Sequence, residues 1–287
     1  MGPTCSGKTE LANYLIGKLN CFAINFDAFQ IYKGMDIGTA KISKQDPNYP
    51  RYRLLDIKNP DESFSVMEYQ KLCREELSRL LMQSKDVVLV GGTGLYVRAA
   101  LYDYTFKKEE TAVDSDLESL SNEELHSLLE KMDFDESKKI HVNNRKRLLR
   151  AITLIRHSNR TKTEVINSQE HKPIYKDVRF IFISPNRETL YKNIDKRVLS
   201  MMESGLIDEV KQLLSRYNLS QTARQGIGYK EVIDYLNNQI SYEECVALIQ
   251  KRTRNYAKRQ VTFFKNQFEC ETYSSYEEAK KVLEAQL

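Results

Sequence analysis

The sequence predicts an α/β fold, a parallel sheet flanked by helices with an all-helical lobe inserted into it, on three observations. A glycine-rich loop at residues 2–9 leads into helical spacing. The β-branched run Val87-Val88-Leu89-Val90 ends in a second glycine-rich turn that also leads into helical spacing. Polar helical patterns without a strand fill residues 102–176. We therefore expect a core of residues 1–101 and 177–287 and a helical lobe of residues 102–176.

The composition is that of an ordinary globular protein. Charged residues make up 29% and hydrophobic residues 41% of the 287 residues, which excludes an intrinsically disordered chain. The net charge of +4 is too small to indicate a nucleic-acid partner by itself. No apolar run approaches a membrane span and no signal-peptide pattern is present, so we expect a cytoplasmic, monomeric protein without membrane contact. Five cysteines without a C-x-x-C pair argue against a disulfide framework and a zinc site.

The opening motif, Gly2-Pro3-Thr4-Cys5-Ser6-Gly7-Lys8-Thr9, matches the phosphate-loop pattern. In such a loop backbone N–H groups converge on phosphate oxygens, Lys8 adds a positive charge, and the Thr9 hydroxyl can hold Mg²⁺ at a helix N-terminus. The alternative is a glycine-rich surface turn, against which the helical spacing of residues 10–16 counts. The loop should follow a buried strand, yet only Met1 precedes it. Either a first strand is missing from this sequence or the sheet begins elsewhere.

The next elements place a carboxylate near this loop. Residues 21–25 resemble a short buried strand, and Asp27 follows at its carboxyl end. Ligands of open α/β sheets bind beyond the carboxyl ends of the strands, so Asp27 is expected to face the same crevice as the loop. The alternative for Asp27 is a helix N-cap or a turn. Residues 53–57 could form a second strand, and Ser65 with Glu68 forms a capping box that opens a helix to about Leu81.

The strand predicted at residues 86–90 ends in Gly91-Gly92-Thr93-Gly94. This turn either approaches a ligand or is merely close-packed, and the motif alone leaves both interpretations open. An ATPase would often carry an acidic metal-holding residue at this strand end, which is absent here. A strand at residues 178–183 and a helix pair at residues 188–216, broken at Gly205, complete the predicted core.

Two segments are rich in cations. Residues 143–152 begin a basic helix, and residues 250–267 hold six basic residues and no acid. On helical spacing the second segment has an apolar stripe, formed by Ala257, Val261, Phe264 and Phe268. A different face of the same helix is basic and carries Lys251, Arg254, Lys258 and Lys265. A solvated basic face is the ordinary interpretation, but two such helices together favour binding to a phosphodiester backbone.

These stretches together resemble one family, the bacterial and organellar tRNA dimethylallyltransferases. The resemblance rests on the phosphate loop and five further motifs in the family's order: Asp27 with the run Gln30 to Lys41, Gly91-Gly92-Thr93-Gly94-Leu95-Tyr96, the basic helix Asn144 to Ala151, Gly228-Tyr229-Lys230-Glu231, and Thr253-Arg254-x-x-Ala257-Lys258-Arg259-Gln260. It implies a core of the phosphate-loop (P-loop) NTPase type, an inserted helical lobe, and a channel between them that receives a flipped adenine. The substrates implied are dimethylallyl diphosphate and a tRNA anticodon stem-loop, with Mg²⁺ as cofactor.

The resemblance also implies roles for particular residues. Asp27 would be the general base on the adenine amino group and Thr93 a second catalytic residue. The diphosphate would be held by Gly2, Thr4, Cys5, Ser6, Gly7, Lys8, Thr9 and Arg224, with Thr9 on the metal. The tRNA would be contacted by Asp27, Ala28, Phe29, Gln30, Thr93, Arg145, Lys146, Arg147, Leu148, Leu149, Gln225, Lys230, Arg254 and Lys258.

The chain departs from the family pattern at two positions near these sites. Ala28 stands where many relatives have serine, which removes a hydroxyl beside the adenine. Gln225 stands where some relatives have arginine, with Arg224 next to it. Two other functions fit parts of the sequence: a P-loop kinase of a nucleotide or small metabolite, and a non-catalytic RNA-binding protein with a vestigial loop. The missing acidic strand end and the basic helices disfavour the first, and intact Lys8 and Thr9 disfavour the second.

Overall fold

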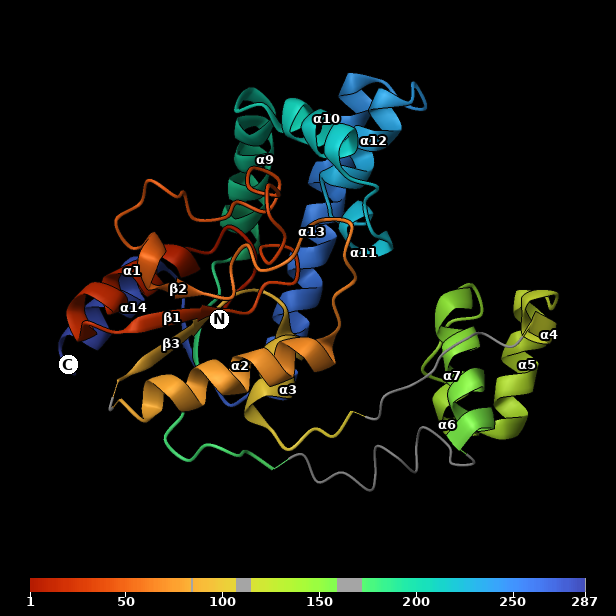
Figure 1. Cartoon of the computed structure of the whole chain (residues 1–287), viewed down its shortest axis with the longest axis horizontal. Coiled ribbons are helices and arrows are strands. Elements are labelled where there is room, and N and C mark those ends of the chain that lie inside the picture. The colour runs from red at the N-terminus through yellow and green to blue at the C-terminus, as the bar shows by residue number, and fades with distance from the viewer. Residues whose placement is uncertain (84, 107–114, 159–171, 287) are drawn as a thin grey trace. The chain divides into compact units, whose positions relative to one another are not determined.

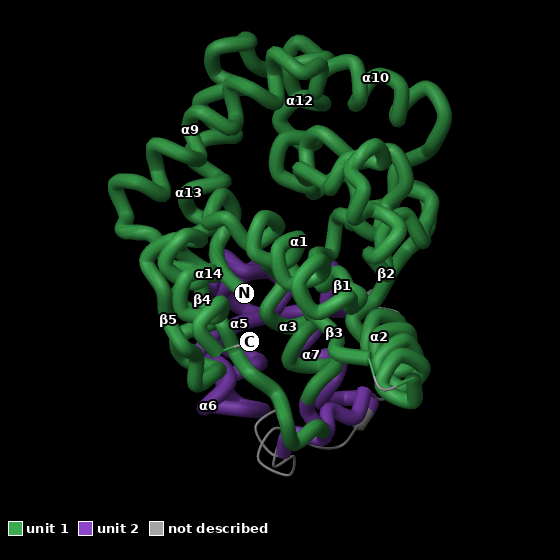
Figure 2. Tube along the Cα trace, turned by 90° about the vertical axis from the view of Figure 1, so that its left-hand side faces the viewer, with its two compact units in different colours: residues 1–101, 175–287 green, residues 102–174 purple. Residues whose placement is uncertain are grey.

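The computed structural model describes all residues except 84, 107–114, 159–171 and 287. The chain divides into two compact units, which Figure 2 shows in different colours. The core unit comprises residues 1–101 and 175–287, and the helical unit comprises residues 102–174. The core unit combines parallel strands with helices, which confirms the predicted α/β class (Figure 1).

The elements of the core unit alternate between strand and helix in its first part and are mainly helical afterwards. Its first part contains α1 (Lys8–Leu19), β1 (Phe22–Asn25), the 3-10 turn η1 (Tyr49–Arg51), β2 (Tyr52–Arg53), α2 (Val66–Leu81), β3 (Val87–Val90) and α3 (Gly94–Leu101). Its second part contains β4 (Ile181–Ile183), α9 (Arg187–Glu203), α10 (Leu206–Arg216), α11 (Gln221–Arg224), α12 (Tyr229–Leu236), α13 (Tyr242–Gln267), β5 (Glu271–Tyr273) and α14 (Tyr276–Glu284).

The described strands form two separate parallel sheets. One has the order β2-β1-β3, with Phe22 to Asn25 opposite Val87 to Val90, and the other pairs β4 with β5. Helix α1 covers both sheets: Ala12 and Ile16 pack with Ala23 of β1, while Leu11 and Leu15 pack with Ile183 of β4. The carboxyl ends of β1 and β3 and the loop before α1 therefore lie at one edge, where ligands of parallel sheets bind.

Two strands are shorter than the sequence predicted. The strand expected at residues 53–57 is only Tyr52–Arg53, because Leu54 and Asp56 adopt positive φ angles of 60° and 53°, which end the extended conformation. The strand expected at residues 178–183 is only Ile181–Ile183, which matches the three residues of its partner β5.

The helix boundaries follow from their caps. The predicted capping box of Ser65 and Glu68 is present, and its two hydrogen bonds start α2 at Val66. Gly205 has a φ angle of 96° and separates α9 from α10, as expected for a residue without a Cβ. The basic helix α13 begins at Tyr242, eight residues before the predicted segment, because Ser241 and Glu244 form another capping box. No helix among the described residues is long and apolar enough to cross a membrane.

The helical unit has its own hydrophobic core. Its described helices are α4 (Ser115–Glu118), α5 (Asn122–Met132), α6 (Phe134–Ser137) and α7 (Arg145–Ser158). Leu125 and Leu129 of α5 pack against Leu148 and Ile152 of α7, and all four side chains are fully buried. Burial of such side chains contributes about 1.5–3 kcal/mol each, which makes these contacts the main stabilising interaction of this unit.

Candidate active site

A cavity of about 320 Å³ lies at the carboxyl edge of the first sheet, within the core unit. Three of its lining residues, Thr4, Lys8 and Thr9, come from the phosphate loop, and Asp27 comes from the segment after β1. The remaining walls come from Phe29 to Ala40, Gly91 and Gly92, and helices α9, α12 and α13. The structure thus brings together predicted site residues that are up to 23 positions apart, together with Gln225 from a distant part of the chain.

The phosphate loop has the backbone that anion binding requires. Gly7 (φ 88°) and Cys5 (φ 62°) adopt left-handed conformations that turn the loop into α1, whose N-terminus begins at Lys8. The Ser6 hydroxyl is buried and has no hydrogen-bond partner among the described residues, although buried hydroxyls are rarely left unpaired. The Lys8 ammonium donates to the Pro3 carbonyl at 2.6 Å. The loop therefore contains polar groups whose bonds a phosphate oxygen could complete.

A second cation faces the loop. Arg197 of α9 lines the cavity, and its Nη1 lies 3.4 Å from Thr4 Oγ1 and 3.5 Å from Cys5 Sγ. The sequence interpretation missed Arg197 because it lies 193 residues from Thr4 in the sequence. One signal was present: Arg197 lies on the same helical face as the buried Ile194 and Val198, where a charged side chain is unexpected.

Burial and the nearby Arg197 charge lower the pKa of Lys8 to about 8, and the Asp27 carboxylate partly opposes this shift. Since only the protonated amine attracts a diphosphate, affinity for dimethylallyl diphosphate should be constant below pH 8 and fall up to tenfold per pH unit above it. Titration calorimetry between pH 6.5 and 9.5, without an acceptor, measures this. Lys8→Met should bind weakly and show no such decline. A decline of equal slope in Lys8→Met would assign it to another group.

Asp27 is held by its own turn. Its backbone N–H donates to Asn25 Oδ1 at 3.0 Å, and Asn25 Nδ2 returns a bond to the Asp27 carbonyl at 3.2 Å. The carboxylate oxygen Oδ1 accepts the Phe29 N–H at 2.9 Å. Among the described residues no hydrogen bond reaches Oδ2. One carboxylate oxygen is thus used to fix the side chain, and the other is left for a ligand in the cavity.

Thr93 acts on the same turn. Its hydroxyl accepts the Ala28 N–H at 3.0 Å, and its backbone N–H donates to the Phe26 carbonyl at 3.1 Å. Thr93 and Ala28 are not among the residues that line the cavity, whereas Phe29 and Gln30 are. The structure therefore supports a positioning role for Thr93, which secures the segment that carries Asp27.

Gln260 of α13 connects the two halves of the site. Its Oε1 accepts the Thr4 N–H at 2.9 Å, and its Nε2 donates to the Gly92 carbonyl at 2.9 Å. A Cβ on Gly92 would lie 2.3 Å from Gln260 Nε2, so a larger residue here would force the Gln260 amide to move. The Gly91 to Gly94 turn is close-packed, and its Gly91 and Gly92 also line the cavity.

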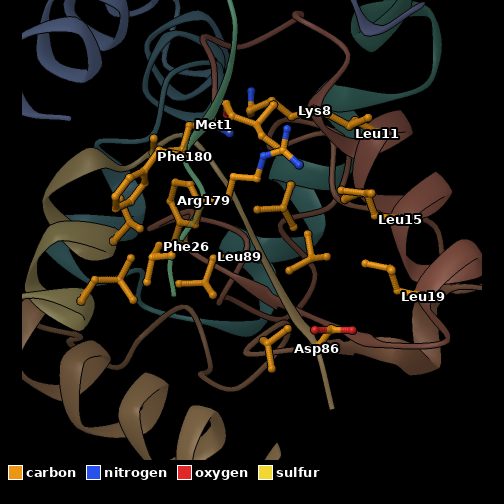
Figure 3. A pocket seen from close by; sticks show the side chains of 18 of the residues that line it. Met1, Lys8, Leu11, Leu15, Leu19, Phe26, Asp86, Leu89, Arg179 and Phe180 are labelled. Atoms are coloured by element: carbon orange, nitrogen blue, oxygen red, sulfur yellow. Dashed lines mark hydrogen bonds between the residues drawn. The ribbon is translucent and has the colours of Figure 1, made fainter. Parts of the chain in front are cut away.

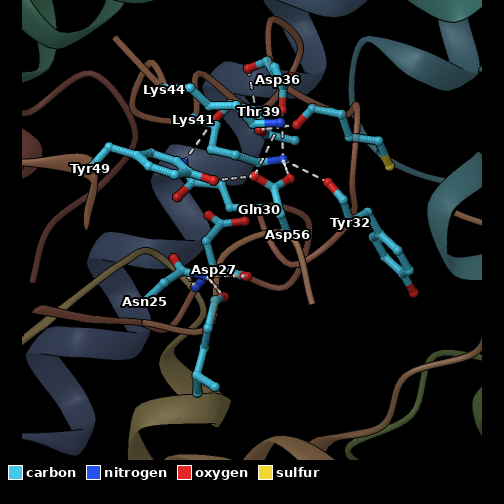
Figure 4. Close-up of polar contacts among 12 residues, drawn as sticks. Asn25, Asp27, Gln30, Tyr32, Asp36, Thr39, Lys41, Lys44, Tyr49 and Asp56 are labelled. Carbon is cyan, nitrogen blue, oxygen red and sulfur yellow. Dashed lines mark hydrogen bonds and ion pairs between the residues drawn. The ribbon is translucent and has the colours of Figure 1, made fainter. Parts of the chain in front are cut away.

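The loop that follows Gln30 is anchored by a buried ion pair. Lys41 is only 1% exposed and donates to Asp36 and Asp56 at 2.7 Å each and to the Tyr32 carbonyl at 2.6 Å (Figure 4). The Tyr49 hydroxyl donates to the second oxygen of Asp56. A buried ammonium is tolerated only when its charge is paired, so this network fixes the wall formed by Gly38, Thr39 and Ala40.

The loop is also held from α10. Glu209 accepts the backbone N–H groups of Asp36, Ile37 and Gly38 at 3.0, 2.7 and 3.2 Å. It also accepts the hydroxyl of Tyr229, which lines the cavity. Glu209 lies outside every motif that the sequence analysis singled out, and no pattern in its surroundings indicates this role.

Several predicted residues lie away from the cavity. Arg224 is exposed and does not line it, whereas the adjacent Gln225 does, so the structure does not support Arg224 as a diphosphate ligand. Lys230 and Lys258 are exposed. Arg254 donates both of its bonds at 2.8 and 2.9 Å to Asp195, so its charge is already paired.

The five residues of α7 that were predicted to contact tRNA fall into two groups, those that pack within the helical unit and those that are exposed. Arg145 donates to the carbonyls of Leu117, Glu118 and Leu120, and Leu148 is fully buried in the unit's core. Their position assigns them to packing rather than to a contact surface, and Leu149 is partly buried against the same core. Lys146 and Arg147 are exposed. Only these two of the five remain suitable for binding RNA in the unit as it stands.

The chain is similar in sequence to the members of one protein family. The sequence model of the IPP transferase family matches residues 30–267. The chain is 40% identical over 275 residues to a tRNA dimethylallyltransferase of Bacillus licheniformis, which covers 94% of this chain and 87% of that protein. It is 38% identical over 286 residues to a tRNA dimethylallyltransferase of Staphylococcus carnosus, which covers 95% and 89%.

The chain belongs to the tRNA dimethylallyltransferase family. Solved structures of tRNA dimethylallyltransferases have the same fold. The tRNA delta(2)-isopentenylpyrophosphate transferase from Staphylococcus epidermidis superposes with a TM-score of 0.73 at 36% identity, covering 100% of this chain and 96% of that one. A eukaryotic dimethylallyltransferase acting on tRNA gives a TM-score of 0.77 at 27% identity, covering 91% and 68%. The family membership confirms the resemblance seen in the motifs.

Proposed function

We propose that this protein transfers the dimethylallyl group of dimethylallyl diphosphate to the exocyclic N6 of an adenine beside the anticodon of tRNA, releasing diphosphate. The observation that carries the proposal is the shared cavity, in which the phosphate-loop residues Lys8 and Thr9 face the Asp27 carboxylate. A site for a leaving diphosphate and a site for a proton acceptor are thus adjacent. The names of the family's members supply the substrates.

The first task of the site is to activate the electrophile, because the adenine amine is a poor nucleophile. The C–O bond between the allyl carbon and the diphosphate breaks as the new N–C bond forms, and negative charge collects on the departing diphosphate. Lys8, Arg197 and the N–H groups before α1 stabilise that charge where it develops. The buried Ser6 hydroxyl has an unused donor that suits the same oxygens.

The site also suits a divalent cation. Thr9 offers a hard oxygen ligand in the cavity, and diphosphate oxygens would supply further ligands, as Mg²⁺ prefers. The described residues contain no cluster of three His, Cys, Asp or Glu side chains that would hold a metal alone. We therefore propose that Mg²⁺ enters with the diphosphate, where it supplies additional charge neutralisation.

The second task is to accept the proton of the alkylated amine. The free Oδ2 of Asp27 is available for this proton, since Oδ1 is held by Phe29 N–H. Stacking on an aromatic side chain can offset the free-energy cost of taking an adenine out of its stack. Phe29 lines the cavity together with Asp27 and offers such a side chain. Thr93 and Gln260 keep these groups in place through their bonds to Ala28, Thr4 and Gly92.

The activity assay also separates the proposed function from its alternatives. The protein is incubated with unmodified tRNA, Mg²⁺ and dimethylallyl diphosphate, and the digested nucleosides are analysed for N6-alkylated adenosine. We expect this product and no turnover of ATP. Turnover of ATP without alkylated adenosine would favour a kinase, and tRNA binding without either product would favour a binding protein.

Arg147 tests the predicted RNA contact of the helical unit. Because Arg147 is exposed, Arg147→Gln should leave the unit folded but remove one phosphate contact. We expect tRNA affinity to fall several-fold and the slope of log K against log salt to decrease by about one. Lys131→Gln, which removes an exposed cation from α5 of the same unit, is the control. Equal salt slopes for the two variants would mean that Arg147 is an ordinary solvent-exposed residue that does not contact tRNA.

A further inference from the structure

A groove of about 480 Å³ lies beside the active-site cavity in the core unit. It runs between helix α9 and the loop at residues 36–45. Its outer rim is formed by exposed polar residues, namely Ser43, Lys44, Gln45, Ser200 and Ser204. The groove is therefore open to solvent, whereas the active-site cavity behind it is lined by the phosphate loop and Asp27.

Four residues line both the groove and the active-site cavity, and they form the partition between the two volumes: Ala40, Ile42, Arg197 and Met201. Arg197 is the cation next to the phosphate loop, so the partition begins where the diphosphate is expected to lie. The other three residues are apolar. The partition thus presents an apolar surface to the cavity beside the diphosphate position.

The loop side of this partition is held firmly. Gln30 Nε2 donates to the carbonyls of Thr39 and Ala40 at 3.1 and 3.4 Å, and the next residue is the buried, ion-paired Lys41. Ile42 packs against the buried cluster between α1 and the first sheet. The positions of Ala40 and Ile42 are therefore determined by the core of the protein.

The helix side of the partition depends on Met201. Ile194, Arg197, Val198 and Met201 are spaced three or four residues apart on α9, so they form one face of the helix, and all four line the cavity. Ile194 and Val198 are buried, whereas Met201 is half-buried between the cavity and the groove. Methionine is unbranched and tolerates substitution better than a tightly packed core residue. Met201 is thus the side chain of the partition that can be changed with least effect on the fold.

The geometry of the reaction directs the allyl chain toward this partition. In a displacement the attacking nitrogen, the allyl carbon and the leaving oxygen lie roughly in line, here between Asp27 and the phosphate loop. The rest of the chain projects sideways from that line and needs an apolar wall. Ile42, Val198 and Met201 supply such a wall next to Arg197.

Another cavity, of about 400 Å³, shares Lys8 and Val90 with the active-site cavity and is lined mainly by apolar side chains (Figure 3). A prenyl chain that entered it would have to pass the Lys8 ammonium, which donates to the Pro3 carbonyl and faces the expected diphosphate. An alkyl chain at this place would remove polar surroundings from a charged group, which is unfavourable. The groove beyond Met201 is therefore the better direction for a longer chain.

We propose that Met201 sets the length of the allylic diphosphate that this site accepts. Its side chain closes the cavity behind a dimethylallyl group and keeps a geranyl group, which is one isoprene unit longer, out of the groove. An apolar pocket discriminates between such chains by steric exclusion rather than by hydrogen bonds. The assignment rests on the proposed transfer of a dimethylallyl group from its diphosphate.

The test compares geranyl diphosphate with dimethylallyl diphosphate in Met201→Ala, which removes Cγ, Sδ and Cε from the partition. Titration calorimetry with Mg²⁺ and without tRNA gives the affinity for each diphosphate. Formation of alkylated adenosine in tRNA gives kcat/KM for each donor. We expect the geranyl-to-dimethylallyl ratio of both quantities to rise at least tenfold relative to the unchanged chain. Met201→Val, a smaller truncation, should raise both ratios less.

Two controls accompany these variants. Met201→Leu keeps nearly the same side-chain volume and should keep both ratios within about threefold of those of the unchanged chain. Leu199→Ala truncates an exposed residue of the same helix that lines neither the cavity nor the groove, and it should leave both ratios unchanged. Melting temperatures establish that each variant is folded.

Unchanged affinity ratios in folded Met201→Ala and Met201→Val would overturn the assignment. An equal rise in Leu199→Ala would also overturn it, because a general loosening of α9 would then be the cause. If no variant forms alkylated adenosine from dimethylallyl diphosphate, the proposed function fails. The affinity ratios, which need no transfer, would still decide whether Met201 limits the chain.

Discussion

Asp27→Asn should lower kcat by about 10²- to 10⁴-fold while tRNA affinity and melting temperature change little. Asparagine keeps an oxygen that can accept the Phe29 N–H, so the turn that presents the side chain remains intact. What is lost is the oxygen that takes the proton of the alkylated amine. The measurement is single-turnover formation of N6-alkylated adenosine with saturating tRNA and dimethylallyl diphosphate, which reports the chemical step rather than binding.

Two controls make this result specific. Asp61→Asn makes the same carboxylate-to-amide change at an exposed position outside the cavity and should leave kcat unchanged. Asp27→Ala removes the bond to the Phe29 N–H as well, so any further decrease measures the positioning part of the side chain's role. Wild-type turnover in Asp27→Asn would remove Asp27 from the role of base, whatever the effect of the alanine variant.

Arg197→Gln should lower kcat/KM for dimethylallyl diphosphate by about 10²-fold, because it removes a charged donor next to the phosphate loop. It should also change the pH dependence. The Arg197 charge is one cause of the lowered Lys8 pKa, so without it that pKa rises above about 8. The alkaline limit of diphosphate binding is therefore expected to move to higher pH even as binding weakens.

The loss of kcat/KM together with the shifted pH dependence distinguishes a direct contact of Arg197 with the diphosphate from a structural role. Arg187→Gln changes an exposed arginine of the same helix, which lies over the Tyr191 ring, and should affect neither quantity. A loss of activity with the wild-type pH profile would indicate that Arg197 only supports the loop. Unchanged kcat/KM would exclude it from the site. Melting temperatures of both variants check that α9 remains folded.

The parts of the fold that the sequence predicted are those with a local physical cause. The capping box of Ser65 and Glu68, the β-branched run of β3 and the break at Gly205 each depend on residues within a few positions of one another. The early end of β2 has no such local cause, because it depends on the positive φ angles of Leu54 and Asp56, and leucine rarely adopts such an angle. Their conformation is imposed by tertiary contacts such as the Lys41 and Asp56 pair.

The residues of the candidate site also fall into two groups, those that a local motif predicts and those that distant helices contribute. Thr4, Lys8, Thr9 and Asp27 belong to short motifs with a mechanism, and all four line the cavity. Arg197 and Glu209 reach the site from helices that are more than 170 residues away, with no motif of their own. The positive charge of Arg224 did not indicate its position, because the residue of this segment that lines the cavity is the next one, Gln225, just after α11.

The hydrogen bonds of Glu209 limit which substitutions the turn at residues 36–38 can accept. A single carboxylate accepts three backbone N–H groups and one phenol, and a Cβ at Gly38 would lie 2.5 Å from the Tyr229 ring. Glutamine offers one acceptor oxygen in place of two, and aspartate is one methylene shorter. The turn at residues 36–38 therefore has little freedom of its own, and its tolerance to substitution is set by α10 and α12. A redesign of this wall of the cavity has to begin at those helices.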